Sequence, residues 1–183
     1  VNNKVVCLID DNMAKKHRIL EGIPIVGGRD DILSNVEKYQ IEKKAYEAFM
    51  RLRQDLLDND GIQAELISVY RTVKQQEAIF ENYTQKFGLE YAKTYAALPG
   101  HSEHQTGLAI DVTSIVTSYG DTAEGKWLAA NCHKYGFVVR YPESKQDITK
   151  IVHEPWHYRY VGKEAAKQIV QKEVCLEEYL DDL

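Results

Sequence analysis

Cysteine, methionine, tryptophan and proline are all scarce in this chain of 183 residues, which contains 3, 2, 2 and 4 of them. The three cysteines, Cys7, Cys132 and Cys175, are odd in number, and no two of them have the spacing of a metal-binding pair. The chain therefore lacks the framework of a disulfide-stabilised secreted domain and of a cysteine-rich zinc module. Unpaired thiols favour a reducing compartment.

An excess of basic charge and a long hydrophobic run are also missing. The 23 Lys and Arg against 28 Asp and Glu give a net charge of -5, whereas nucleic-acid binders usually carry a basic footprint. The longest apolar run near the N-terminus, residues 5–9, is too short for a signal peptide or a membrane span and is expected to form a strand or a docking segment. We expect no nucleic-acid partner, no membrane anchor and a cytoplasmic location, and since the chain begins at Val1, missing upstream residues are left open.

The length and the 44% hydrophobic content are typical of one domain with a sizeable core. We expect a single catalytic domain over residues 1–183, with residues 1–35 as an N-terminal extension packed on it. Apolar periodicity predicts an α+β fold, in which helices surround a small, mostly antiparallel sheet. The expected helices cover residues 36–57, 72–87 and 123–135 and begin at Lys163 and Leu176, and the expected strands cover residues 61–68, 108–113 and 137–140.

Two segments carry the residues of a metal centre. The first runs from Ser102 to Asp111 and includes His104, and the second is Glu154-Pro155-Trp156-His157. Two imidazoles and one carboxylate are a ligand set of catalytic zinc, because they leave a fourth position open for water or substrate. Asp111 lies in an apolar run, where a carboxylate is costly to bury unless a strong partner such as a divalent cation accompanies it.

The residues between the ligands allow them to meet. Gly107 permits a positive φ or a close backbone approach, and Pro155 interrupts regular pairing so that Glu154 and His157 can face one cavity. Glu154 is then a free carboxylate beside the metal. The other histidines are expected to be structural or solvated, with His153 the one nearest the site.

These segments resemble the zinc D,D-peptidases that share a fold with lysostaphin-type and hedgehog-type domains. The match is best for the vancomycin-resistance enzymes, in particular the bifunctional D,D-dipeptidase/D,D-carboxypeptidases, and it covers roughly residues 60–182. The resemblance is carried by residues 97–100, 102–111, 136–142 and 154–162.

The resemblance implies a role for each candidate residue. His104, Asp111 and His157 would hold Zn²⁺, and Glu154 would act as general base and then as general acid. Arg71, at a junction between a strand and a helix capped by Thr72, would stabilise the oxyanion. Gln76 would contact the substrate and Ser102 would bind its C-terminal carboxylate. Without the family, Arg71 is an ordinary surface cation and Ser102 a turn or cap serine.

One residue departs from the family pattern. The dipeptidase members carry an Asp three residues before the arginine, suited to a free substrate ammonium, and this chain has Ser68 there. A hydroxyl binds an ammonium less strongly than a carboxylate does. We therefore expect carboxypeptidase action on peptidoglycan precursor peptides ending in D-Ala-D-Ala to be at least as prominent as cleavage of free D-Ala-D-Ala. By resemblance, this activity contributes to vancomycin resistance.

Two alternatives from other classes are open at this point. A peptidoglycan L-alanyl-D-glutamate endopeptidase would use the same zinc ligands, although no secretion signal or wall-binding module is visible. A non-catalytic zinc-binding module is suggested by the hedgehog-type relatives, and the presence of Glu154 and Arg71 argues against it. The dipeptidase balance, the native metal and the oligomeric state are not fixed by the sequence.

Overall fold

The computed structural model describes residues 19–20, 23–24 and 41–183. A short antiparallel pair joins β1 (Ile19–Leu20) to β2 (Ile23–Pro24). The main body is built on a four-stranded antiparallel sheet of order β3-β4-β6-β5. Its strands are β3 (Leu66–Ser68), β4 (Ala109–Val112), β6 (His157–Tyr160) and β5 (Phe137–Val139).

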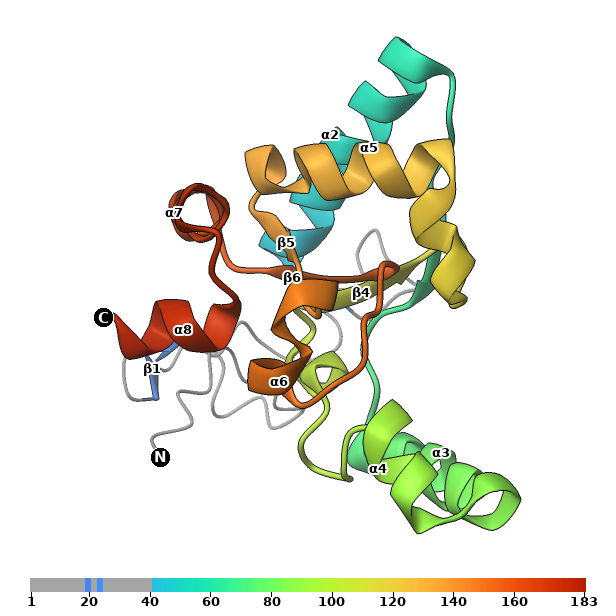
Figure 1. Cartoon of the computed structure of the whole chain (residues 1–183). Coiled ribbons are helices and arrows are strands. Elements are labelled where there is room, and N and C mark those ends of the chain that lie inside the picture. The colour runs from blue at the N-terminus through green and yellow to red at the C-terminus, as the bar shows by residue number, and fades with distance from the viewer. Residues whose placement is uncertain (1–18, 21–22, 25–40) are drawn as a thin grey trace.

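Helices surround this sheet, which confirms the predicted α+β class (Figure 1). Helices α2 and α5 lie on one side of it, α3 and α4 form a hairpin that projects from one end, and α7 and α8 lie at the other end. The helices are α2 (Lys43–Asp60), α3 (Val73–Phe87), α4 (Leu89–Tyr95), α5 (Ala123–Asn131), α6 (Gln146–Thr149), α7 (Lys163–Lys172) and α8 (Leu176–Asp181). Short 3₁₀ turns are η2 (Glu103–Thr106), η3 (Thr117–Asp121), η4 (Cys132–Tyr135) and η5 (Glu143–Lys145).

The two faces of the sheet carry different kinds of side chains. Ile110 and Tyr158 are buried in the main core together with Leu56 of α2. Successive side chains of a strand point to opposite faces, so the neighbours Asp111 and His157 face away from that core. A smaller cluster on the other face joins the C-terminal helices to the sheet through Val138, Ala166, Ile169, Leu176 and Tyr179.

The local signals in the sequence explain several element ends. Thr72 caps α3, since its hydroxyl accepts from the amide of Gln75 and the Gln75 side chain returns to the Thr72 amide, as a capping box requires. Gly107 ends η2 with a φ of 67°, the left-handed conformation that glycine adopts without strain. The predicted N-cap and the predicted positive φ are both confirmed.

Other elements differ from the predictions. Strand β6 was not predicted, because it is only four residues long, closely follows Pro155 and has tyrosine as its only apolar residue type. Helix α4 and the turn η3 lie outside every predicted element. The predicted strand at residues 61–68 is real only from Leu66, where pairing with β4 begins.

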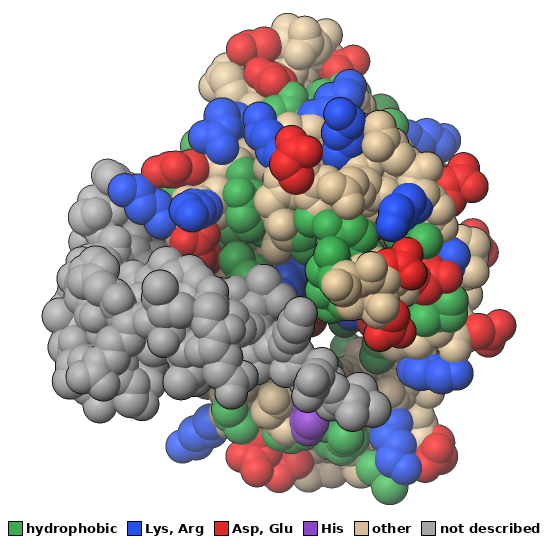
Figure 2. Space-filling view, turned by 90° about the vertical axis from the view of Figure 1, so that its left-hand side faces the viewer, with side chains coloured by type: hydrophobic (Ala, Val, Ile, Leu, Met, Phe, Trp, Pro, Cys, Tyr) green, Lys and Arg blue, Asp and Glu red, His purple; other side chains and the backbone are tan. Residues whose placement is uncertain are grey.

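Some predictions fall outside the described residues, namely the segment 5–9, Cys7 and, apart from β1 and β2, the extension over residues 1–35. The single-domain assignment stays a prediction. Cys132 and Cys175 are both free and buried. Within the described part of the chain, no helix is long and apolar enough to cross a membrane. On the face shown in Figure 2, acidic and basic side chains of the described residues are interspersed.

The packing of α2 predicts which of two neighbouring leucines stabilises the core. Leu56→Ala removes a side chain that is 0% exposed and should lower the free energy of unfolding by ~2–5 kcal/mol. The same substitution at the next residue, Leu57, which is 42% exposed, should change it by only about 0.5 kcal/mol. Urea denaturation measures both values, and equal losses would contradict this assignment of the buried face.

Candidate metal centre and active site

The pairing of β4 with β6 places two candidate ligands side by side. Asp111 lies directly opposite His157 in the register of the two strands. The turn η2 brings His104 to the same point, so that ligand atoms of all three buried side chains lie within 4.8 Å of one another. His104 Nε2 is 3.2 Å from Asp111 Oδ2, and His157 Nδ1 is 3.0 Å from Asp111 Oδ1. The residues predicted as metal ligands therefore converge.

The hydrogen bonds around His104 test whether a cation fits. Its Nδ1 lies 2.5 Å from the carbonyl oxygen of Val69, which can only accept, so Nδ1 carries the hydrogen. In that neutral tautomer Nε2 presents a lone pair to the Asp111 carboxylate. Two electron pairs facing each other at 3.2 Å require a proton or a metal cation between them. The donor set of two imidazoles and a carboxylate suits zinc.

The protonation of the cluster follows from its charges. Burial alone would raise the pKa of Asp111, but contacts with His104 and His157 outweigh burial and hold that pKa well below its usual range. Burial likewise opposes the charged form of His157, yet the carboxylates of Asp111 and Glu103 raise its pKa to about 9. Burial lowers the pKa of His104. The carboxylates around the two imidazoles therefore favour a cation at this point.

Glu154 lies beside the three candidate ligands and is not one of them. Its Oε2 lies 3.6 Å from His157 Nδ1, and its side chain is 15% exposed. Burial, reinforced by the negative charges of Asp111 and Glu103, raises the pKa of Glu154 to about 7. The Glu154 amide donates to the carbonyl of Tyr141, and the His153 ring contacts the same oxygen at 2.8 Å. His153 thus anchors this segment rather than joining the cluster.

Arg71 reaches the cluster from the end of β3. Its Nη2 is 3.8 Å from Asp111 Oδ2 and donates to Ser68 Oγ at 3.1 Å. Its Nη1 donates to Gln76 Oε1 at 2.7 Å, and the Gln76 amide donates to the carbonyl of Ala97. Gln76 is only 1% exposed, so in this structure it positions Arg71. Substrate contact by Gln76 stays a prediction.

Ser102 has a local role in the structure. It is 7% exposed and caps η2, where its hydroxyl accepts from the His104 amide at 3.4 Å. This cap fixes the first turn that presents His104. The predicted contact of Ser102 with a substrate carboxylate stays a prediction.

Sequence reasoning missed a charge cluster behind the metal ligands. Glu103 Oε1 accepts from Arg140 Nε at 2.7 Å and pairs with Arg159 Nη1 at 2.9 Å. Arg140 also makes a forked pair with Glu177 of α8 at 2.9 and 2.6 Å. These residues come from separate elements, so no spacing in the sequence reveals them. The signal in the sequence that could have pointed to this cluster is Glu103, an acidic residue directly before the candidate ligand His104.

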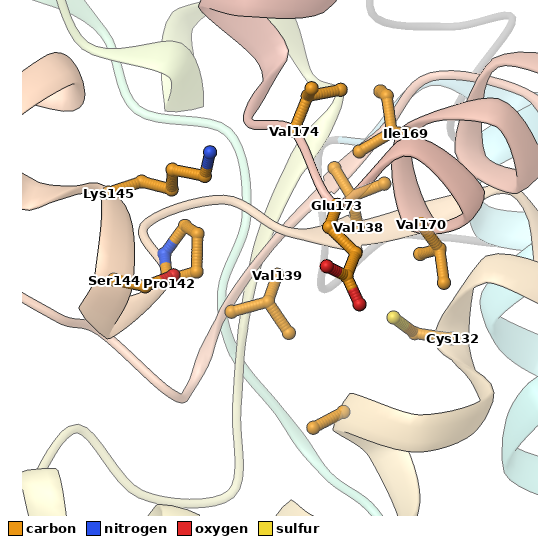
Figure 3. A pocket seen from close by; sticks show the side chains of 11 residues that line it. Cys132, Val138, Val139, Pro142, Ser144, Lys145, Ile169, Val170, Glu173 and Val174 are labelled. Carbon is orange, nitrogen blue, oxygen red and sulfur yellow. The ribbon is translucent and has the colours of Figure 1, made fainter.

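A separate hollow of about 530 Å³ lies beside β5 and α7 (Figure 3). Its walls are largely apolar, and none of its lining residues belongs to the metal cluster. The lining includes Cys132, Val138, Val139, Pro142, Ile169 and Val174. The polar chemistry of the chain is thus concentrated elsewhere, at the junction of β3, β4, β6 and η2.

Comparison with known sequences gives a family. The family model described as "VanY: D-alanyl-D-alanine carboxypeptidase" matches residues 38–163. A bifunctional D-Ala-D-Ala dipeptidase and D-Ala-D-Ala carboxypeptidase of Enterococcus gallinarum, VanXYC, is 44% identical over 64% of this chain and 66% of its own length. The chain spans only 51% to 58% of three other curated relatives.

Solved structures agree with the predicted fold. The LD-carboxypeptidase LdcB superimposes with a TM-score of 0.73 at 43% identity, over 81% of this chain and 73% of that one. A glutamate-to-alanine variant of the vancomycin-resistance D,D-pentapeptidase VanY, solved with Zn(II), gives a TM-score of 0.70 at 36% identity, over 81% and 86%. The resemblance to vancomycin-resistance D,D-peptidases predicted from the motifs is confirmed. This chain belongs to the VanY family of D-alanyl-D-alanine carboxypeptidases.

Proposed function

We propose that this chain is a zinc-dependent D,D-carboxypeptidase that removes the C-terminal D-alanine from peptidoglycan precursor peptides ending in D-Ala-D-Ala. The observation that carries the proposal is the convergence of three buried ligands, with Glu154 and Arg71 on the border of the same cluster. Membership in the VanY family supports the same substrate class. Loss of the terminal D-alanine would remove the precursor end that vancomycin recognises.

The residues suited to hold zinc are His104 through Nε2, Asp111, and His157 through Nδ1. When bound there, zinc supplies a Lewis acid that polarises the scissile carbonyl and lowers the pKa of water from 15.7 toward about 7. The VanY relative solved with Zn(II) supports this choice of metal.

The other side chains handle the proton and the developing charge. The Glu154 carboxylate accepts a proton from the attacking water while the water oxygen bonds to the scissile carbonyl carbon. It then gives that proton to the nitrogen of the departing D-alanine as the peptide bond breaks. Arg71, held by Ser68 and Gln76, donates to the oxygen that becomes negative, and one such preorganised donor contributes about 3 kcal/mol.

A second candidate activity has support of its own. LdcB is an LD-carboxypeptidase, and it matches this chain with 43% identity. The two reactions differ in the configuration of the amino acid before the terminal D-alanine. The VanXYC relative is also a dipeptidase that acts on D-Ala-D-Ala, and we infer the same second activity for this chain, although Ser68 is less suited than Asp to bind a substrate ammonium. The non-catalytic alternative is disfavoured by the placement of Glu154 and Arg71.

Replacement of the proposed acid/base separates catalysis from metal binding. Glu154→Gln should lower kcat for D-alanine release by about 10²- to 10⁴-fold, because no group then accepts the water proton. Zinc content, measured by atomic absorption, should stay at one ion per chain. Glu143→Gln, an exposed glutamate on η5, is the matched control and should retain wild-type kcat. Full activity of the Glu154 variant would exclude Glu154 as the base.

Replacement of a ligand should abolish metal binding. His104→Gln removes one imidazole from the cluster, so zinc affinity should fall by more than the about 10- to 100-fold typical of losing an outer partner. His101→Gln changes an exposed histidine three residues earlier and should leave affinity unchanged. Competition with a chromophoric chelator measures both. Equal affinities of the two variants would be incompatible with His104 as a ligand.

A set of three substrates tests the specificity. We expect D-alanine release from an acylated peptide ending in D-Ala-D-Ala to be at least as fast as release from free D-Ala-D-Ala. The reason is that Ser68 binds an ammonium less strongly than Asp does. The third substrate ends in L-Lys-D-Ala. If only that substrate is cleaved, the LD-carboxypeptidase activity replaces the proposal. If an internal L-alanyl-D-glutamate bond of the acylated peptide is the only bond cleaved, the endopeptidase activity replaces it.

A further inference from the structure

Glu103 lies behind the metal cluster with its two oxygens in different environments. Its side chain is 14% exposed. Oε1 contacts both guanidinium groups, Arg140 Nε at 2.7 Å and Arg159 Nη1 at 2.9 Å. Oε1 alone therefore binds both guanidinium groups. This leaves Oε2 free of them and fixes the direction in which Oε2 points.

The second oxygen of Glu103 points at a metal ligand. Oε2 lies 3.6 Å from His157 Nε2, and neither atom has a hydrogen-bond partner among the described residues, although both are buried. The other ring nitrogen of His157, Nδ1, faces Asp111 at 3.0 Å and Glu154 at 3.6 Å. The ring thus has the metal cluster at one nitrogen and Glu103 at the other.

An imidazole binds a metal through a nitrogen that carries no hydrogen, and the partner of its other nitrogen decides which nitrogen that is. His104 is held in this way by the carbonyl of Val69. His157 needs an equivalent acceptor at Nε2, and Glu103 is the acceptor that faces it. A shift of ~0.4 Å would bring the 3.6 Å contact into hydrogen-bond range.

We propose that Glu103 is a positioning residue of the metal centre, whose Oε2 accepts the Nε2 hydrogen of His157 and thereby fixes Nδ1 as the metal-binding nitrogen. This inference rests on the proposed zinc site. Arg140 and Arg159 hold the carboxylate in place, and the forked pair of Arg140 with Glu177 joins this support to α8.

The test is Glu103→Gln, which keeps the volume of the side chain and changes one oxygen to an amide nitrogen. The two guanidinium groups require an acceptor at the position of Oε1, so the amide oxygen lies there and the amide nitrogen faces His157 Nε2. A donor at that point favours a lone pair on Nε2 and a hydrogen on Nδ1, the tautomer that cannot bind the metal. Zinc affinity should fall by about 10- to 100-fold.

Glu177→Gln is the matched control, because Glu177 pairs with Arg140 and is not one of the carboxylates that face His157. Its zinc affinity should stay within about threefold of wild type, the scatter of a peripheral substitution. Zinc affinities of the full chain are measured by competition with a chromophoric chelator. Thermal unfolding of the metal-free proteins accompanies them, and we expect both variants to lose stability through their shared partner Arg140.

A second variant guards against misfolding. Glu103→Asp keeps the charge beside the two arginines and withdraws it from Nε2 by one methylene, so it should fold as wild type and bind zinc about tenfold more weakly. The inference is overturned if affinity is unchanged in either Glu103 variant, or if Glu177→Gln loses as much as Glu103→Gln. Wild-type protein that binds zinc yet releases no D-alanine contradicts the proposed function, while the affinity ratios still decide this inference.

Discussion

The antiparallel pairing of β4 with β6 is the constraint on which the rest of the structure depends. It sets Asp111 opposite His157 on one face of the sheet and leaves Ile110 and Tyr158 for the core on the other. A shift of one residue would bury Asp111 against α2 and expose Ile110. Core packing therefore maintains the geometry of the metal centre, because the register that satisfies the hydrophobic face is the one that pairs the two ligands.

The site places three carboxylates around a single imidazole, and their surroundings separate their roles. Burial opposes ionisation of both glutamates that contact His157. For Glu103, the charges of Arg159 and Arg140 overcome burial and hold its pKa well below the usual range. For Glu154, burial prevails, and the pKa rises to about 7. Carboxylates whose environments separate their pKa values in this way are suited to different tasks, one fixed in charge and one able to exchange a proton.

The sequence indicated the candidate metal ligands that converge in the structure, but it indicated less of the scaffold that holds them. His104, Asp111 and His157 were identifiable because few protein functions need two imidazoles and a carboxylate in such segments, and Thr72 because capping is local. Strand β6 was missed because its four residues give only a short alternation of polar side chains with tyrosines and depend on β4 and β5 for their hydrogen bonds. Glu103 was missed for a related reason, since its contacts with Arg140 and Arg159 exist only after the sheet has formed.

Support for the site extends beyond the part of the chain that matches the family model, which ends at residue 163. Glu177 of α8 makes a bidentate pair with Arg140, and Arg140 in turn binds Glu103 behind His157. Leu176 and Tyr179 of the same helix share an apolar cluster with Val138 of β5, two residues before Arg140 in the chain. An ion pair this close to the surface contributes little to the stability of the fold by itself, but a planar guanidinium bound on both sides has a fixed orientation. The C-terminal helix is therefore joined through Arg140 to the carboxylate that faces His157. An arginine suits position 140 because a lysine could not bind both partners in one plane.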